Sequence, residues 1–220
     1  MGDKNLKQYY AKRAAYYERI YTKPERQIDL NEIRNFLQAE FENQDILEIA
    51  CGTGYWTQPI SKTAKSIFAT DANKEVIDVA KQKLYEKNNV KFEIADAFKL
   101  DNISGLFSAG FSGFWWSHIS LTKIREFLKL FHSKLAPNSQ VIFIDNQYVE
   151  GNNNPMSDNV DVDGNTYSIR ILDDGKKYEI LKNFPTDEAL KNSLTGIATS
   201  IEIKRLTYYW CLSYRALSSE

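Results

Sequence analysis

Residues 45–56 read DILEIACGTGYW, an apolar strand pattern that breaks into two glycines, Gly52 and Gly54, separated by one residue. In an open parallel sheet, ligands bind beyond the carboxyl ends of the strands. A glycine at such an end lets the backbone approach a ligand that a Cβ atom would hold away. The stretch therefore predicts a strand followed by a ligand-binding turn. A tight structural turn between strand and helix is the alternative.

The spacing of the glycines limits which ligand this turn suits. The dinucleotide fingerprint requires a third glycine after two more residues, and Thr57 occupies that position. Pyrophosphate binding is therefore disfavoured, and a nicotinamide-dependent oxidoreductase is a weaker alternative.

Short apolar runs alternate with helical patterns along the chain. This alternation predicts βαβ units and a single α/β domain over residues 1–220, with a mainly parallel sheet. The expected strands are 46–49, 67–70, 90–94, 110–114 and 141–144. The expected helices are 5–21, 24–41, 58–65, 74–86, 122–135 and 185–194.

The pattern changes after Asp145. Residues 147–165 are rich in Asn, Asp and Gly, which predicts a surface loop. Residues 167–184 predict a hairpin that turns at Asp174-Gly175, because this dipeptide supplies the positive φ angles of a tight turn. Strands near 201–206 and 208–213 are expected to close the chain.

Composition excludes several classes of protein. The 28 basic and 29 acidic side chains of the 220 residues nearly cancel, so no overall field attracts nucleic acid. Two cysteines are too few for a disulfide framework, and no Cys/His cluster has zinc spacing, so no metal site is expected. The polar N-terminus and the lack of a membrane-spanning apolar run predict a cytoplasmic protein without a membrane partner.

Two acids follow the next expected strands. Asp71 ends the strand about twenty residues after the glycine turn, where a carboxylate accepts hydrogen bonds from ribose hydroxyls. Asp96 ends the third strand, where an acid can accept from an adenine amino group. Either acid alone could cap a helix. Together with the glycine turn they predict an adenosine-containing ligand without a pyrophosphate.

At these positions the chain resembles the class I S-adenosylmethionine-dependent methyltransferases. Residues 48–54, EIACGTG, resemble the acidic-x-Gly-x-Gly-x-Gly loop of that family, with Ala50 in place of the first glycine. The alanine would be strained if its φ were positive. The resemblance implies a Rossmann-like fold with an antiparallel C-terminal strand and an S-adenosylmethionine cofactor. It implies as cofactor-binding residues Tyr10, Arg13, Tyr17, Glu48, Ala50, Gly52, Gly54, Trp56, Asp71, Ala72, Asp96, Ala97 and Phe114.

The N-terminal segment resembles that of a narrower group within this family. Residues 9–17, YYAKRAAYY, resemble the lid helix of small-molecule methyltransferases, most closely the phosphonate O-methyltransferases. By this resemblance residues 1–43 form a helical lid, Arg13 pairs with the cofactor carboxylate, and 147–184 form an insertion near the acceptor site. An amphipathic helix whose tyrosines pack on the domain is the alternative.

Residues 114–119, FWWSHI, follow the fourth expected strand and are candidates for the chemistry. Trp115 and Trp116 could form a dry aromatic wall that favours a sulfonium charge, or they could belong to the core. His118 could remove a proton from a hydroxyl acceptor, orient an anionic acceptor, or be structural.

Two basic residues near the hairpin, Arg170 and Lys182, match basic positions of the phosphonate enzymes and suggest an anionic acceptor. Ordinary solvated strand charges are the alternative. The expected substrate-binding residues are Trp115, Trp116, His118, Tyr148, Arg170 and Lys182.

These observations predict an enzyme, monomeric or homodimeric, that methylates an oxygen or nitrogen of a small acceptor. An RNA or protein methyltransferase is one alternative, although the sequence shows neither a basic stripe nor an added recognition domain. A non-catalytic adenosine-ligand-binding protein is the other.

Overall fold

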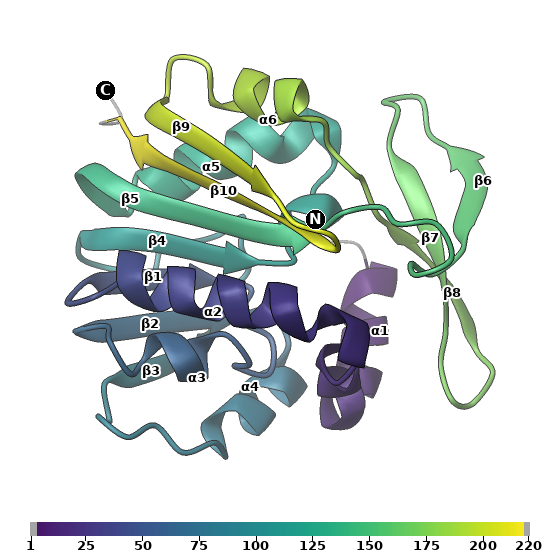
Figure 1. Ribbon diagram of the computed structural model, residues 1–220, viewed down its shortest axis with the longest axis horizontal. Helices are drawn as coiled ribbons and strands as arrows, with labels where there is room; N and C mark the ends of the chain where they lie inside the picture. The colour runs from purple at the N-terminus through teal and green to yellow at the C-terminus, as the bar shows by residue number, and fades with distance from the viewer. Residues whose placement is uncertain (1–3, 218–220) are drawn as a thin grey trace.

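The computed structural model describes residues 4–217. Its central sheet has seven strands in the order β3-β2-β1-β4-β5-β10-β9, and a smaller sheet has the order β6-β7-β8 (Figure 1). The strands of the central sheet are β1 Asp45–Ile49, β2 Ser66–Asp71, β3 Val90–Ile94, β4 Phe107–Gly113, β5 Leu135–Asn146, β9 Ala198–Arg205 and β10 Tyr209–Ala216. The smaller sheet contains β6 Met156–Val160, β7 Thr166–Ile171 and β8 Lys177–Leu181.

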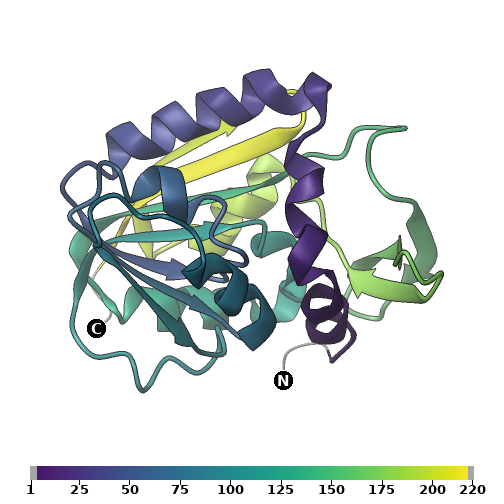
Figure 2. The same cartoon turned by 90° about the horizontal axis from the view of Figure 1, so that it is seen from below.

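The helices surround the central sheet, and α1 lies at one end of it (Figures 1 and 2). The α-helices are α1 Lys4–Arg13, α2 Gln27–Glu40, α3 Thr57–Ile60, α4 Lys74–Lys81, α5 Ile124–His132 and α6 Asp187–Leu194. Short 3₁₀ helices are η1 Ala14–Tyr21, η2 Pro24–Arg26, η3 Trp116–His118 and η4 Leu121–Lys123.

The predicted fold class is confirmed. Strands β3, β2, β1, β4 and β5 pair in parallel, and β10 runs antiparallel between β5 and β9. The strand order reverses between β1 and β4, because β2 and β3 extend to one side and β5 to the other. In such sheets the carboxyl ends at the reversal form the ligand crevice.

Two apolar cores hold the layers together. On one face of the sheet α2 buries Leu30, Ile33 and Leu37, which recur at helical spacing. The other face packs against α5, which buries Phe127 and Phe131. Full burial of each such side chain contributes roughly 1.5–3 kcal/mol.

Several expected elements differ in extent. The helix expected over 5–21 is α-helical only to Arg13 and continues as η1, whose Tyr21 is buried among other aromatic side chains. The helix expected over 58–65 is limited to α3, and the one over 74–86 ends at Lys81. The helix expected to end at Leu135 ends at His132, and Leu135 begins β5.

The loop expected over 147–165 contains strand β6, which the sequence analysis missed. The sequence of β6, MSDNV, is mostly polar, and its side chains are half-buried or exposed. Its pairing with β7 uses the backbone, so no apolar alternation marks the strand. The hairpin turn at Asp174-Gly175 is confirmed, with Gly175 at φ 78° between β7 and β8.

Within residues 4–217, no helix has both the length and the apolar character that crossing a bilayer requires.

His132 gives the fold a measurable pH dependence. Its Nε2 lies 2.8 Å from the buried hydroxyl of Tyr214, and burial lowers the pKa of His132 from 6.5 to about 4. Between pH 6.5 and about pH 4, His132 is therefore protonated in the unfolded chain and neutral in the folded chain. The free energy of unfolding falls as the pH falls through this range. The free energy of unfolding of wild type should decrease between pH 7 and pH 5. We expect His132→Gln to make this decrease roughly 1–2 kcal/mol smaller.

Urea unfolding of both proteins at the two pH values measures this difference. Wild type and His132→Gln with parallel pH dependence would show that His132 titrates normally in the folded chain.

Candidate functional site

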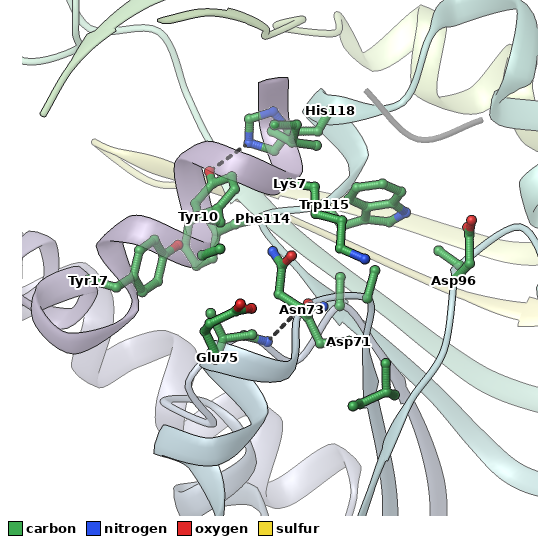
Figure 3. Close-up of a pocket in the computed structure, with 18 of the residues that line it drawn as sticks. Lys7, Tyr10, Tyr17, Asp71, Asn73, Glu75, Asp96, Phe114, Trp115 and His118 are labelled. Atoms are coloured by element: carbon green, nitrogen blue, oxygen red, sulfur yellow. Dashed lines mark hydrogen bonds between the residues drawn. The ribbon is translucent and has the colours of Figure 1, made fainter. Parts of the chain in front are cut away.

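A cavity of about 710 Å³ lies at the carboxyl ends of the parallel strands, and residues of the N-terminal helix α1 form part of its lining. Figure 2 shows α1 at this end of the sheet. This volume is typical of sites that enclose a small ligand. Figure 3 shows its lining side chains, which come from α1, η1 and the segments after β1, β2, β3 and β4. Among the predicted site residues, the lining contains Tyr10, Tyr17, Ala50, Gly52, Asp71, Ala72, Asp96, Ala97, Phe114, Trp115 and His118.

Asp71 ties the glycine turn to the end of β2. Its Oδ2 accepts from the Gly52 N–H at 3.0 Å, and its Oδ1 accepts from the Asn73 N–H at 2.8 Å. Burial raises the pKa of Asp71 to about 6, although these backbone donors oppose the shift. The side chain is therefore a carboxylate at neutral pH, with remaining lone pairs available to ligand hydroxyls.

The two glycines of the turn have different roles. A Cβ on Gly52, which lines the cavity, would meet nothing within 4 Å, so this glycine leaves room for a ligand. A Cβ on Gly54 would lie 2.7 Å from the Tyr85 hydroxyl and 3.1 Å from Ala80 Cβ. Gly54 therefore permits close packing against the α4 region. Ala50, with φ 56°, adopts the left-handed conformation in which an alanine is strained.

Asp96 both stabilises a turn and lines the cavity. Its Oδ1 accepts from the Phe98 N–H at 2.9 Å, a turn-forming bond, while the residue lines the cavity. In the described part of the chain no donor is bonded to its Oδ2. One carboxylate oxygen therefore remains for an amino group of a ligand.

Four residues predicted to bind the cofactor, Gly54 included, do not line the cavity. Glu48 is buried behind the turn, where burial and the neighbouring Asp71 raise its pKa to about 8. Trp56 packs on Phe114, with ring centroids 6.4 Å apart. Arg13 donates from Nη1 to the Tyr9 hydroxyl at 2.7 Å. Direct contacts of these residues with a cofactor stay predictions.

His118 has a defined protonation pattern. Its Nδ1 lies 2.6 Å from the Leu181 carbonyl oxygen, and its Nε2 lies 3.0 Å from the Tyr10 hydroxyl (Figure 3). Burial and the positive Lys182 lower the pKa of His118 to about 3, against the opposing charge of Asp145. The imidazole is therefore neutral at physiological pH. Because a carbonyl only accepts, Nδ1 carries the proton and Nε2 presents a lone pair.

Lys182 is buried and paired. Its Nζ lies 2.9 Å from Asp145 Oδ1 and donates to Ser117 Oγ at 2.6 Å. The Ser117 N–H donates to the other oxygen of Asp145 at 2.9 Å. This cluster joins the end of β5, the end of β8 and the turn that carries His118. The charge of Lys182 is thus already paired with a carboxylate within the protein.

Arg170 on β7 differs from Lys182, because no carboxylate among residues 4–217 pairs with it. Its Nε is buried without a hydrogen-bond partner. Its charge lies close enough to affect the pKa values of both Tyr10 and His118. A guanidinium that lacks a carboxylate partner is suited to an anionic ligand.

Of the six predicted acceptor residues only Trp115 and His118 line the cavity; Lys182 and Arg170 do not, and neither do Trp116 and Tyr148. Trp116 is in the core, where its ring packs edge-on against Phe143 and Trp210. Tyr148 is 51% exposed and packs against Phe184.

Sequence reasoning missed part of the lining. Leu6, Lys7 and Gln8 of α1 contribute to it, as do Asn73, Glu75 and Val76 at the start of α4. Asn73 Oδ1 is buried without a partner in the described structure. Its place two residues after the strand-end acid Asp71 was the signal that could have identified it.

The comparisons with known proteins agree on one kind of protein, the methyltransferases. A family model described as a methyltransferase domain matches residues 46–138. The structure of DhpI in complex with SAH has a TM-score of 0.78 and 25% identity, over 98% of this chain and 97% of that chain. The DhpI–SAM–HEP complex, at 24% identity, has the same TM-score of 0.78 and covers 96% of both chains.

Curated relatives match less of their length. The tRNA N(3)-methylcytidine methyltransferase of Schizosaccharomyces pombe is 24% identical over 76% of this chain and 65% of its own. A probable ribosomal RNA small subunit methyltransferase A of Methanosphaera stadtmanae is 36% identical over 27% of this chain and 23% of its own. The chain therefore spans about a quarter to two thirds of the length of the curated relatives it matches.

Proposed function

Because the chain is a class I S-adenosylmethionine-dependent methyltransferase in fold and family match, we propose that it methylates an oxygen of a small anionic acceptor. The observation that carries this proposal is one cavity that brings Asp71 and Asp96 together with His118 beneath α1. A nitrogen acceptor is the closest variant of the same function.

The residues of the cavity fit S-adenosylmethionine. The Asp71 carboxylate and the unpartnered Asn73 Oδ1 suit ribose hydroxyls, and the free oxygen of Asp96 suits an adenine amino group. S-adenosylmethionine, when bound, supplies a methyl group on a positively charged sulfur. Aromatic side chains from two segments, Tyr17 of η1 and Phe114 and Trp115 after β4, would exclude water and favour a positive charge beside their faces.

The acceptor half of the cavity would contain His118 and approach Arg170. The Nε2 lone pair of His118 can accept the proton of an acceptor hydroxyl. Arg170 can bind a carboxylate or phosphonate through two parallel N–H···O bonds. Holding the acceptor between these groups would contribute chiefly through orientation.

An RNA acceptor is a second candidate, because two curated relatives are named for RNA substrates. The charge of this chain, with 28 basic and 29 acidic side chains, does not favour a polyanion. The cavity is also lined on one side by residues of α1, and its volume of about 710 Å³ suits a small ligand.

Asp71→Ala is expected to weaken binding of S-adenosylhomocysteine by about 1–3 kcal/mol, because ribose hydrogen bonds to a charged acceptor are lost. Isothermal titration calorimetry measures the affinity. Asp101→Ala, which removes an exposed acid after β3, is the matched control.

The same proteins, tested for thermal stabilisation by S-adenosylhomocysteine and by NAD, separate the two cofactor classes. Full affinity for S-adenosylhomocysteine in folded Asp71→Ala would exclude the proposed adenosine site.

Arg170→Gln is expected to raise KM for an anionic acceptor about tenfold or more, because a charge-assisted hydrogen bond contributes about 1.5 kcal/mol or more. The KM for a neutral ester or amide of the same acceptor should change little, because that ligand never made the charged contact. Methyl-transfer assays with the paired acceptors test this. Equal effects on both acceptors would exclude an anionic substrate and leave the cofactor assignment intact.

A further inference from the structure

The hydrogen bond between Tyr10 and His118 is the contact from which a further role follows. The Tyr10 hydroxyl is 3.0 Å from Nε2, and the Nδ1 proton is committed to the Leu181 carbonyl at 2.6 Å. The neutral ring therefore has one acceptor site, at Nε2. Tyr10 is the donor to it, because burial raises the pKa of Tyr10 well above its ordinary value and keeps the phenol protonated.

A hydroxyl that donates to Nε2 is what a methyl acceptor must also present if His118 is to take its proton. Nε2 has a single lone pair in the ring plane, so two hydroxyls cannot both use it fully. The phenol of Tyr10 thus stands where an acceptor hydroxyl would stand.

We propose that Tyr10 is an acceptor-mimicking cap on His118, which occupies Nε2 until a hydroxylated acceptor displaces it. This inference rests on the proposed function for the displacement step and on the hydrogen-bond geometry for the cap itself. It makes Tyr10 a residue that determines acceptor selectivity, because a competing ligand must offer Nε2 a donor at least as good as a phenol.

The β7–β8 hairpin positions both partners of the hydrogen bond between Tyr10 and His118. The helix that carries Tyr10 is docked through Leu6 and Tyr9, which are buried against Tyr178 and Ile180 of β8. The Tyr9 and Tyr178 rings lie 5.8 Å apart. Strand β8 ends at Leu181, whose carbonyl fixes His118 Nδ1. Docking of α1 on β8 therefore brings the phenol to the ring that β8 orients.

The charged surroundings define what removal of the cap should do. His118 faces Asp145 from β5, Lys182 from the end of β8 and Arg170 from β7, and Tyr10 reaches it from α1. A donor at Nε2 stabilises the neutral ring. Its loss should therefore raise the pKa of His118, and the three charged groups stay unchanged.

The test uses ¹⁵N NMR of the full chain without an acceptor. The histidine signals are readily assigned, because the sequence contains 2 histidines. Wild type should show a neutral His118 protonated at Nδ1 and hydrogen-bonded at Nε2. In Tyr10→Phe the Nε2 resonance of His118 should move toward that of an unbonded nitrogen, and the pKa of His118 should rise by about 0.5–1 unit. The resonances of His132 should not move.

Tyr9→Phe is the matched control, because it removes another hydroxyl group from the same helix. The Tyr9 hydroxyl accepts a hydrogen bond from Arg13 and does not contact His118. This variant should leave the His118 resonances unchanged. A His118 spectrum in Tyr10→Phe that equals the wild-type spectrum, or an equal shift in Tyr9→Phe, would overturn the cap.

The displacement step is tested with a hydroxylated acceptor found by methyl-transfer screening. Tyr10→Phe should lower the acceptor KM about two- to tenfold, since the acceptor no longer competes with a hydrogen bond of that strength. A kcat that falls more than tenfold with KM unchanged would instead make Tyr10 a proton relay and overturn the inference. If the NMR change occurs but no acceptor is methylated by any of these proteins, the proposed function fails while the cap is established.

Discussion

His118→Ala is expected to lower kcat/KM for a hydroxylated acceptor by roughly 10²–10⁴-fold, the range of a positioned general base. The low pKa of His118, about 3 in the acceptor-free protein, keeps Nε2 unprotonated throughout the physiological range. It also makes the ring a weak base, so the loss should lie toward the lower end of that range. The loss should shrink as pH rises and the acceptor ionises without help. Methyl-transfer rates across pH 5–9 measure both effects.

His118→Asn is the informative companion variant, because its side-chain amide can keep a donor to the Leu181 carbonyl while Nε2 is absent. If both variants lose rate alike, the lost function belongs to Nε2. Affinity for S-adenosylhomocysteine should be retained in both, which separates the base from the cofactor site. A rise in acceptor KM alone, constant with pH, would show that His118 only orients the acceptor.

The half of the cavity that we propose for the cofactor is built from strand ends, so its lining residues were largely predictable from the sequence. A parallel sheet places the carboxyl ends of its strands at one edge, so Gly52, Asp71 and Asp96 meet there once their strands are identified. Periodicity reveals such strands but not which side of a turn faces the ligand. Glu48 and Gly54 therefore seemed equivalent to their neighbours, yet they lie behind the turn.

The acceptor half depends on contacts between segments far apart in the chain. Lys182 and Arg170 are both basic residues of one hairpin, and nothing local distinguishes them. The difference arises because Asp145, which is 37 positions before Lys182, lies 2.9 Å from Nζ and neutralises it. Tyr10 and His118 are 108 positions apart, so the cap could not be predicted from spacing.

The ion pair between Lys182 and Asp145 carries the second large expected effect. Lys182→Ala should lower the free energy of unfolding by about 3–5 kcal/mol, because it leaves the Asp145 carboxylate buried without its counter-charge. The side chains of Lys182 and Asp145 are 3% and 0% exposed, so solvent cannot replace the lost partner. Urea denaturation at pH 7 measures the change.

A double substitution separates the charge from the packing. Lys182→Met with Asp145→Asn removes both charges while keeping similar volumes and an acceptor for the Ser117 N–H, so most of the lost stability should return. Lys74→Ala, which breaks the exposed pair with Asp78 on α4, is the surface control and should leave the free energy of unfolding nearly unchanged, because water screens that pair. A cost for Lys182→Ala as small as that of Lys74→Ala would mean that the pair is solvated. Lys182 would then be free to bind an acceptor, and the distinction drawn between Lys182 and Arg170 would be lost.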